Sequence, residues 1–442
     1  MSTTVLYVCH NHPSVRPGGG EQYALELHRA MAAREDVTSV FLAKGGPPLS
    51  PVGQLHLGTY VSPVGRRDDE YFLFTDGYDY DWFYGTMRVS KELYTKHYRD
   101  FLLSVRPDVV HFHHTMFLGY DMLRATRAAL PDAAIVYTLH EFMPICHRQG
   151  QMVRTVDERP CLEESPRRCH ECFPDISPQQ FFLRKRFVQS HFTVVDQFIA
   201  PSRFLMDRYL DWGIPPERIR VEEYGRSIDT FEEGSAPARR DRIGFFGQLN
   251  PYKGIRTLLL AMQRLIADPL DDGPDGPVAT PRLRVHGANL DLQPGSFQNE
   301  IAELLDASAS HVTFVGRYEK DQVGEMMRQI DWVVIPSTWW ENSPLVIQEA
   351  FAHGRPVIAS DIGGMAEKVT DGVDGLHFRA GDPDSLASTI RAAVGTPGLW
   401  ERLNGGIRSP YAMEDHVREI SSLYKSLLDA RRTEGRVSSL HA

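Results

Sequence analysis

The sequence predicts an α/β protein made of two doubly wound domains, each a parallel sheet covered by helices. The chain has 442 residues, enough for two domains, and 42% of them are hydrophobic, enough for two cores. An apolar strand followed by an amphipathic helix opens the chain at Val5–Cys9, and the same pattern begins again at Arg242–Phe246. Between these starts, Glu232–Arg240 has the Gly-, Ser- and Pro-containing composition of a linker.

The expected domain limits follow from these patterns. We expect one domain over residues 1–235, a second over residues 236–410 and a C-terminal helical segment over residues 411–442. Asp268–Pro281 is rich in Asp, Gly and Pro, which predicts a surface insertion in the second domain. In the last segment, His416–Arg431 predicts an amphipathic helix and Thr433–Ala442 a frayed end.

Charge and hydropathy exclude several classes of partner. The net charge is −10, which argues against nucleic acid, because binding to a phosphate backbone needs a basic surface. No apolar run has the length of a membrane span, and the first residues lack the basic start of a signal peptide, so we expect a cytoplasmic protein. The run Arg184-Lys185-Arg186 predicts either peripheral contact with anionic lipid or a solvated helix face.

The stretch from Asp331 to Glu367 contains the most closely spaced candidate ligand-binding residues. Trp332–Ile335 predicts a strand, Pro344–His353 a short helix and Pro356–Ala359 a second strand. Ser343 suits an N-cap and Pro344 the first helical position. The amides of Leu345 and Val346 would then be left free at a positive helix end, where a phosphate is stabilised.

Two carboxylates, Glu341 and Glu349, flank this junction. Eight positions along one helix would separate them by about 12 Å of rise, so they share a ligand only if Glu341 lies before the helix. One carboxylate could then meet a sugar and the other a ribose, as acidic residues do in dinucleotide sites. Two surface glutamates on an ordinary strand-helix-strand unit remain an equal alternative.

Features of the first domain also point to a ligand site. Gly18, Gly19 and Gly20 lie at a strand-to-helix turn, where glycines let the backbone approach a ligand, although a flexible turn is an alternative and the G-x-G-x-x-G pattern is absent. Asp108–His114 and Ile135–His140 predict strands that end in histidines, and active groups of open α/β sheets collect at such ends. The acidic, aromatic run Asp68–Tyr84 suits a carbohydrate acceptor, because rings pack on sugars while acids accept hydroxyl hydrogen bonds, although core packing is the usual role of such rings.

The Asp331–Glu367 stretch resembles the donor-site signature of the retaining GT-B glycosyltransferases of family 4, also called group 1. The shared elements are the strand ending in Pro-Ser, the two glutamates and two later glycine motifs, here Pro336-Ser337, Glu341, Glu349, Gly354–Ala359 and Gly363-Gly364 with Glu367. The chain has Asn342-Ser343-Pro344 where many relatives have Gly-Phe-Gly. The resemblance implies two Rossmann-like domains facing across a cleft, with the nucleotide sugar held by the second.

The resemblance extends to three further elements and fails at two positions. Thr138-Leu139-His140-Glu141 is similar to the Thr-x-His-Asp element, whose histidine contacts the donor sugar, and Gly18–Gly20 to a loop near the donor phosphates. Lys253 is similar to a lysine on the donor diphosphate, whereas Gln248 stands where relatives have a second cation, Arg. Tyr224 stands where relatives have Asn.

The activity implied is transfer of a sugar from a nucleoside-diphosphate sugar, with UDP or GDP favoured, to a carbohydrate or glycosylated small-molecule acceptor. Anomeric configuration would be retained and no catalytic metal is expected. Catalytic roles fall to His140, Glu341 and Lys253. Donor binding falls to the residues Gly18, Gly19, Gly20, Gln248, Lys253, Asn342, Ser343, Pro344, Leu345, Val346 and Glu349. A catalytically decayed GT-B scaffold that only binds nucleotide sugar, and a nicotinamide oxidoreductase, are the alternatives.

Four of the five cysteines lie in one short segment. Cys146, Cys161, Cys169 and Cys172 end in a C-x2-C pair, and a reducing compartment disfavours disulfides. The spacing predicts a structural zinc site, with His147 and His170 as substitute ligands. Four unligated thiols are the alternative.

Overall fold

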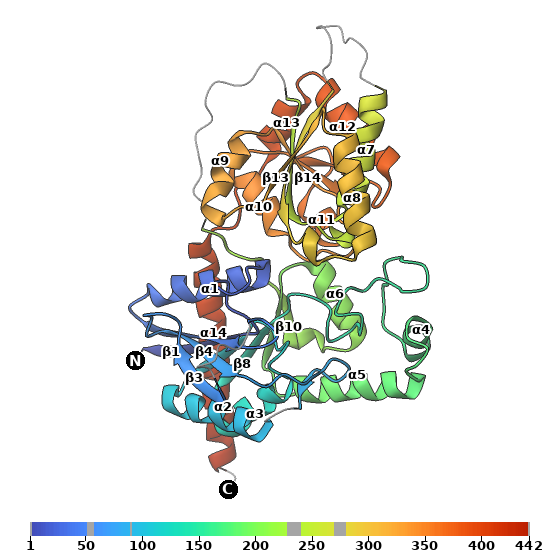
Figure 1. Cartoon of the computed structure of the whole chain (residues 1–442). Helices are drawn as coiled ribbons and strands as arrows, with labels where there is room; N and C mark the ends of the chain where they lie inside the picture. Colours follow the sequence, from blue (N-terminus) through green and yellow to red (C-terminus); the bar gives the residue numbers. More distant parts are fainter. Residues whose placement is uncertain (1, 51–56, 89–90, 228–239, 269–279, 441–442) are drawn as a thin grey trace. The chain divides into compact units, whose positions relative to one another are not determined.

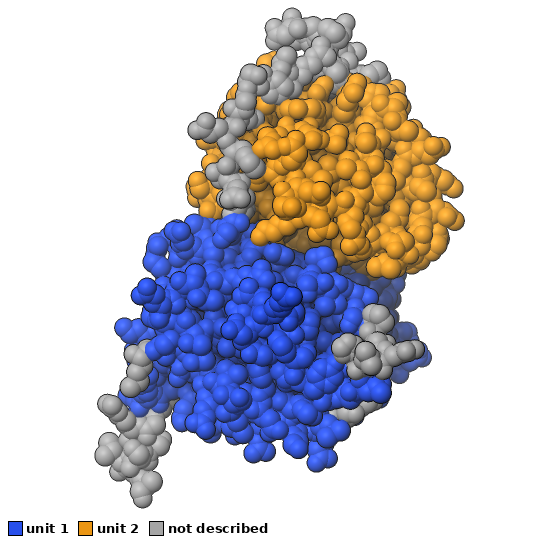
Figure 2. All heavy atoms as spheres, turned by 60° about the vertical axis from the view of Figure 1, so that its left-hand side comes forward, with its two compact units in different colours: residues 1–227, 411–442 blue, residues 228–410 orange. Residues whose placement is uncertain are grey.

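The computed structural model describes residues 2–50, 57–88, 91–227, 240–268 and 280–440, with only the backbone of residues 434–440. The chain divides into two compact units, residues 1–227 with 411–442 and residues 228–410 (Figures 1 and 2). Most of the expected linker Glu232–Arg240, the expected boundary at 235 and most of the expected insertion Asp268–Pro281 lie outside the described residues. The α/β fold with doubly wound parallel sheets is confirmed in both units.

Unit 1 is built on an eight-stranded sheet in the order β10-β9-β8-β7-β1-β2-β4-β3. Neighbouring strands pair in parallel except for the antiparallel edge pair β3 and β4. The strand order runs outward in both directions from the β1–β7 pair, so the carboxyl ends of these two strands flank a topological switch point. The strands are β1 (Thr3–Cys9), β2 (Val37–Gly45), β3 (Thr59–Pro63), β4 (Glu70–Thr75), β7 (Val109–Phe112), β8 (Ala134–Thr138), β9 (Gln197–Ala200) and β10 (Ile219–Val221), with a separate hairpin of β5 (Tyr80–Asp81) and β6 (Thr86–Met87).

The helices of unit 1 begin where local capping allows. The expected helix from Phe181 begins earlier, at Pro178, because Ser177 and Gln180 form a reciprocal capping box. The C-terminal helix runs to Leu440 rather than fraying from Thr433, since no proline interrupts it, and it packs on the first helix and on β8. The helices are α1 (Gly19–Ala32), α2 (Lys91–Val105), α3 (Asp121–Ala129), α4 (Pro166–Cys172), α5 (Pro178–Phe192), α6 (Arg203–Trp212), η1 (Pro216–Arg218) and α14 (Met413–Leu440).

Unit 2 has a six-stranded, fully parallel sheet in the order β13-β12-β11-β14-β15-β16, with its own switch point between β11 and β14. The strands are β11 (Arg242–Gln248), β12 (Arg282–Ala288), β13 (Val312–Gly316), β14 (Trp332–Ile335), β15 (Val357–Ser360) and β16 (Gly375–Phe378). The helices are η2 (Pro251–Lys253), α7 (Ile255–Ala267), η3 (Leu290–Leu292), α8 (Gly295–Ala307), η4 (Lys320–Gln322), α9 (Val323–Arg328), α10 (Leu345–Ala352), α11 (Gly363–Lys368), α12 (Pro383–Gly395) and α13 (Leu399–Gly406).

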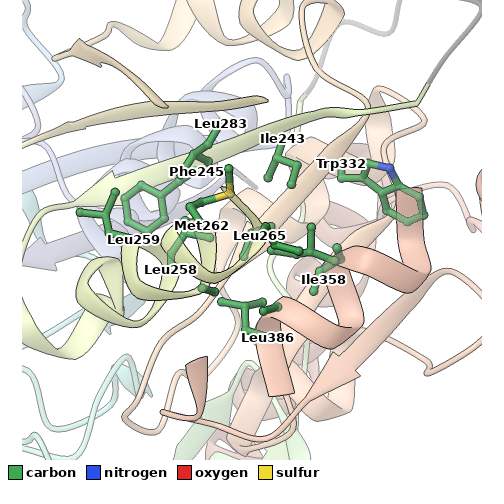
Figure 3. Close-up of a cluster of buried hydrophobic side chains, with 14 of the residues drawn as sticks. Ile243, Phe245, Leu258, Leu259, Met262, Leu265, Leu283, Trp332, Ile358 and Leu386 are labelled. Atoms are coloured by element: carbon green, nitrogen blue, oxygen red, sulfur yellow. The ribbon is translucent and has the colours of Figure 1, made fainter. Parts of the chain in front are cut away.

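Apolar clusters cover both faces of the unit 2 sheet. One cluster joins the sheet to α7, α8, α12 and α13, and Figure 3 shows Phe245, Leu259 and Met262 packed together in it. The other joins the sheet to α9, α10 and α11. Trp332 is fully buried in the first cluster, and its indole N–H donates to the Arg240 carbonyl oxygen. These two cores hold the strand ends that carry the site.

Candidate active site

An ion pair lies at the switch point of unit 2. Lys253 follows β11, Glu341 follows β14, and the Lys253 Nζ atom is 2.6 Å from Glu341 Oε1. The same carboxylate oxygen accepts hydrogen bonds from Ser337 Oγ at 2.8 Å and Trp339 Nε1 at 2.9 Å. Burial alone would raise the pKa of the Glu341 carboxyl, but Lys253 and these donors hold the pKa below its ordinary value. Glu341 is therefore an ionised acceptor held in one orientation.

Two glycines allow the loops to meet at this pair. Gly254 has a φ of 72°, and a Cβ atom there would collide with the Pro336 carbonyl oxygen at the end of β14. A Cβ atom at Gly364 would collide with the Asn342 carbonyl oxygen, and the Gly364 amide donates to the Glu341 carbonyl oxygen at 2.6 Å. The Lys-Gly and Gly-Gly motifs therefore serve the close packing of the Glu341 loop.

The helix after Glu341 starts one residue later than the sequence predicts. Pro344 is the N-cap of α10, no side chain caps the helix, and the predicted cap Ser343 is wrong. Ser343 Oγ is instead buried without a hydrogen-bond partner among the described residues. The amides of Leu345 and Val346 thus begin an uncapped helix, which leaves them available to an anion.

Glu349 and Gln248 flank the pair on other elements. Glu349 is partly buried on α10, and its carboxylate adds to burial in raising the pKa of the Tyr318 hydroxyl. Gln248 is exposed at the end of β11, where its Oε1 accepts from Asn250 Nδ2 at 3.4 Å.

In unit 1 the glycine loop packs against His140. Gly18 is the extended N-cap of α1 and Gly19 its first residue, and a Cβ atom at Gly20 would lie 3.2 Å from the His140 ring. His140 Nδ1 is 2.6 Å from the Tyr224 hydroxyl, and its Nε2 is 3.2 Å from His113 Nδ1. Burial, with the neighbouring histidines, lowers the pKa of His140 well below its ordinary value, so the ring is neutral.

Two histidine–glutamate pairs beside His140 are not predicted from the sequence. His10 Nε2 is 3.0 Å from Glu21 Oε1, and His114 Nε2 is 3.0 Å from Glu141 Oε1. His10 directly follows β1, and both members of the second pair follow β7 and β8, the neighbouring strands. The strand-end positions of the two histidines are visible in the sequence, since His10 directly follows β1 and His114 lies two residues after β7, but their pairing with the glutamates is not.

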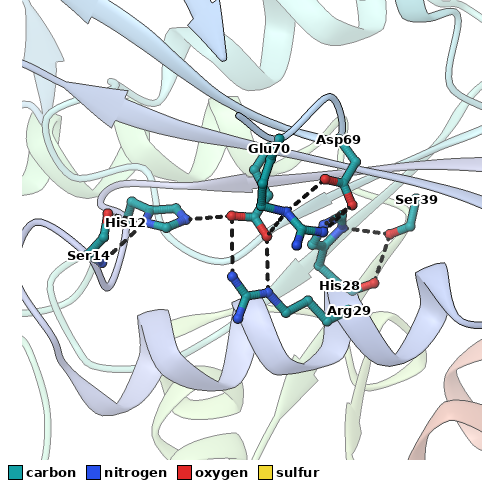
Figure 4. A network of polar contacts seen from close by, with 8 residues as sticks. His12, Ser14, His28, Arg29, Ser39, Asp69 and Glu70 are labelled. Atoms are coloured by element: carbon teal, nitrogen blue, oxygen red, sulfur yellow. Dashed lines mark hydrogen bonds and ion pairs between the residues drawn. The ribbon is translucent and has the colours of Figure 1, made fainter. Parts of the chain in front are cut away.

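The acidic aromatic run Asp68–Tyr84 uses its carboxylates internally. Asp81 accepts the backbone amides of Phe83 and Tyr84 and pairs with Arg88. Figure 4 shows Glu70 bound by His12 and Arg29, and Asp69 beside His28. Asp69 and Glu70 therefore hold α1 to the sheet. Tyr80 is buried in an apolar cluster, and the partly exposed rings of Tyr78 and Trp82 pack against it.

Among the described residues, the four cysteines of the segment 146–172 are not joined by disulfides, and each is partly buried. Within the described residues, the one group of three donor atoms close enough to share an ion is that of His28, Asp69 and Glu70, whose carboxylates are paired with arginines. Zinc at Cys146, Cys161, Cys169 and Cys172 therefore stays a prediction.

Arg184 does not belong to a solvated basic surface. It is buried, and its guanidinium donates to the carbonyl oxygens of Phe83, Met143, Pro144 and Ile145. The prediction of a three-residue basic patch is thus wrong, since Arg184 lies on the inward face of α5 with Phe181 and Val188. None of the helices in the described ranges combines the length and apolar character that a membrane crossing needs. Peripheral lipid contact stays a prediction.

Comparison with known proteins decides the family. A model described as Glycosyltransferase Family 4 matches residues 17–223, and one described as Glycosyl transferases group 1 matches residues 240–395. The chain belongs to this glycosyltransferase family. The resemblance recognised in the sequence is therefore confirmed over most of both units.

Curated relatives and solved structures agree with this assignment. The chain is 26% identical to a D-inositol 3-phosphate glycosyltransferase of Geodermatophilus obscurus, over 94% of this chain and 86% of the relative. It is 32% identical to the enzyme of that name from Acidothermus cellulolyticus, over 52% of each chain. Sucrose-phosphate synthase from Thermosynechococcus elongatus has a TM-score of 0.71 at 17% identity, covering 97% of this chain and all of that one. Anabaena HepE, in complex with UDP and glucose, has a TM-score of 0.65 at 16% identity, covering 96% of this chain and 100% of that one. The fold is GT-B.

Proposed function

We propose that this glycosyltransferase moves a sugar from a nucleoside-diphosphate sugar to an acceptor hydroxyl with retention of anomeric configuration. The observation that carries the proposal is the Lys253–Glu341 pair in front of the uncapped helix α10, at the switch point of a doubly wound sheet. An ammonium and free helix amides suit a diphosphate, and an oriented carboxylate suits sugar hydroxyls. Glu349, on the same helix, is assigned to the ribose.

The proposed reaction breaks the bond between the anomeric carbon and the β-phosphate oxygen and forms one between that carbon and the acceptor oxygen. The acceptor proton passes to the departing diphosphate. Lys253 and the amides of Leu345 and Val346 stabilise the negative charge that develops, so no catalytic metal is required. Glu341 orients the donor sugar, which becomes oxocarbenium-like. In unit 1 we assign His140 to the sugar and the loop Gly18–Gly20 to the phosphates.

The solved relatives support a nucleotide donor and a carbohydrate acceptor. HepE has been solved in complex with UDP-glucose, and starch synthase IV from Arabidopsis thaliana bound to ADP and acarbose. UDP or GDP is the donor base that we propose to test first. Gln248 favours a second candidate, a nucleotide-sugar-binding protein without turnover, because one cation of the family's donor site is replaced by an amide.

The test is a thermal-shift panel of UDP-, GDP-, ADP- and dTDP-sugars, with the free diphosphates as controls. We expect one base to raise the melting temperature selectively, because a ligand of the native state stabilises it by mass action. NMR of the product with the stabilising donor would then show the anomeric configuration. Binding without any transfer or donor hydrolysis would favour the second candidate, and absence of any shift at millimolar nucleotide would refute both.

A further inference from the structure

The carboxyl edge of the unit 1 sheet holds polar groups that the proposed mechanism does not use. His10 follows β1, His114 follows β7 and Glu141 follows β8, three adjacent strands at the switch point of the sheet. Ligands of open α/β sheets bind outside the carboxyl ends of strands at such a point. Glu21, in the first turn of α1, completes the set.

The two pairs lie side by side and present their carboxylates. The rings of His10 and His114 are 4.6 Å apart between centroids. In the first pair the His10 side chain is 10% exposed and that of Glu21 15%, whereas in the second His114 is 8% exposed and Glu141 25%. The carboxylates are therefore the more accessible members of the pairs, and each histidine holds its glutamate from the more buried side.

An aromatic surface adjoins the pairs. Phe117 lies 6.4 Å from His10 between ring centroids, and the rings of Trp82 and Tyr78 pack edge-on against Phe117 at 5.7 Å and 6.0 Å. Phe117 has a φ of 61°, a backbone conformation that a bulky residue keeps only where its surroundings impose it. Trp82 and Tyr78 are partly exposed. Apolar rings beside oriented hydrogen-bond acceptors are the combination that a sugar ring requires.

The charge of this edge is unfavourable to anions. Burial lowers the pKa of His10, and although burial would raise the pKa of Glu21, its partner His10 brings that pKa to about 2, so the pair carries a negative charge. Two neighbouring cations are already engaged, Arg184 by backbone carbonyl oxygens and Lys44 by the carbonyl oxygens of Gly45 and Pro47. A phosphate on the acceptor ring that Glu21 and Glu141 bind would therefore meet these carboxylates, whereas the donor phosphates are assigned to the backbone of the loop Gly18–Gly20 and to Lys253.

We infer that this edge is the acceptor subsite and that it selects an uncharged, polyhydroxylated acceptor over one that carries phosphate on the ring it binds. The inference rests on the proposed function, because an acceptor exists only if the protein transfers sugar. Glu21 and Glu141 accept acceptor hydroxyls, and Trp82 covers a sugar face. The preference is opposite to the one implied by the names of the D-inositol 3-phosphate glycosyltransferases among the relatives.

The experiment compares matched neutral and phosphorylated probes by calorimetric titration of the full chain saturated with UDP or GDP. The pairs are myo-inositol with D-myo-inositol 3-phosphate, and glucose with glucose 6-phosphate. We expect the neutral member of a pair to bind at least about tenfold more tightly, the size of one moderately screened charge repulsion. Equal or tighter binding of the phosphorylated members overturns the inference, and so does the absence of binding by all four probes at 50 mM.

Charge-neutral variants test the assigned residues. Glu21→Gln and Glu141→Gln should lower the ratio of the affinity for the neutral probe to that for the phosphorylated probe. Glu158 is an exposed glutamate paired with Arg148, and Glu158→Gln should leave this ratio unchanged. Trp82→Leu should weaken binding of both members of a pair, in contrast to Phe182→Leu on the exposed face of α5. A ratio that the glutamate variants do not move overturns the inference.

The same samples separate failure of this inference from failure of the proposed function. Nucleotide-induced thermal shift reports the donor site and not the acceptor subsite. If UDP or GDP stabilises the protein while the probes show no charge preference, only the acceptor subsite is wrong. If no nucleotide stabilises it, the proposed function falls first, whatever the probes show.

Discussion

The two units place opposite chemistry at equivalent points of the same architecture. Each sheet has a switch point beside its first strand, β1 with β7 in one unit and β11 with β14 in the other. In unit 2 this point holds the Lys253–Glu341 ion pair and an uncapped helix start, and in unit 1 two carboxylates supported by buried histidines. If both proposals hold, the fold fixes where a ligand binds, and a few loop residues decide whether that ligand is an anion or an uncharged polyol.

The largest expected effect comes from removing the cation of unit 2. Lys253→Ala should lower kcat/KM for the donor by about a thousandfold, because one preorganised charge at the leaving group is lost. Lys185→Ala is the matched control, since Lys185 also pairs with a glutamate, at 3.1 Å from Glu164, and is 26% exposed where Lys253 is 28%. Turnover of Lys253→Ala within threefold of the wild-type value would contradict the assignment of Lys253 to the leaving group, and with it the proposed difference between the two units.

The two units should also respond differently to acid. Burial lowers the pKa of His28 and His147 to about 4 and that of His111, His113 and His140 well below its ordinary value, and all five lie in unit 1. Such a histidine is neutral when folded but takes up a proton when unfolded below its ordinary value of 6.5. Its contribution to the free energy of unfolding is complete above pH 6.5 and is lost as the pH falls toward the pKa of the histidine in the folded protein.

We therefore expect unit 1 to lose stability more steeply than unit 2 between pH 7 and pH 5. Each histidine contributes up to about 1.4 kcal/mol per pH unit. In unit 2, His286 and His353 are the described histidines whose pKa is lowered. Hydrogen exchange, corrected for the pH dependence of the intrinsic rate, would resolve the two units. Equal acid sensitivity of both would contradict this expectation.

A smaller effect tests how His140 is held. Tyr224→Phe should reduce kcat about tenfold with little change in donor KM, because the Nδ1 partner of His140 is lost while the ring packing stays. Nitrogen-15 NMR of labelled histidine should show a changed tautomer for His140, a signature that a general loss of stability would not produce. Tyr98→Phe, which removes a buried hydrogen bond to Thr126, is the control. An unchanged His140 tautomer would refute the positioning role.

The sequence predicted the site residues that directly follow strands. It did not predict the side chains from distant segments that form hydrogen bonds or ion pairs with such residues. Glu341 and Lys253 meet because both follow central strands of unit 2, a relation that strand patterns predict. Tyr224 is 84 residues from His140, and nothing in its local sequence indicates the hydrogen bond. Glu141 and His114 pair through the registry of β7 with β8, which no single-sequence pattern gives.

Local errors had equally physical causes. Ser343 was expected to cap a helix from its type and position, but the chain keeps Pro344 extended, so the helix begins after it. The run Arg184–Arg186 was expected to be solvated from its charge, but a helix separates adjacent residues by about 100° and turns one of the three inward. In both cases the expectation was drawn from residue type, whereas the backbone conformation at Pro344 and the inward-facing position of Arg184 on α5 decide the outcome.

The smallest expected effect concerns the cysteine segment, which has no counterpart in unit 2. Helix α4 carries Cys169 and Cys172 and has no buried residue, so apolar packing does little to hold it. Burial raises the pKa of the Cys169 thiol to about 12, with Glu164, Cys146 and Cys161 adding to the shift. The thiols of Cys146, Cys161 and Cys169 are thus near one another and protonated, and zinc would have to deprotonate them and draw their sulfurs to ligand distance.

We expect one zinc per chain by mass spectrometric metal analysis, and a melting temperature of unit 1 lowered by a few degrees in a strong chelator, because a bound metal stabilises only the folded segment. Cys172→Ser should abolish zinc content, whereas Cys9→Ala, in the buried strand β1, should not. Less than stoichiometric zinc together with a chelator-independent melting temperature would show that the four thiols are unligated. The segment would then be held by its backbone pairing and ion pairs, such as Arg148 with Glu158, and the two units would differ at their switch points but not in metal content.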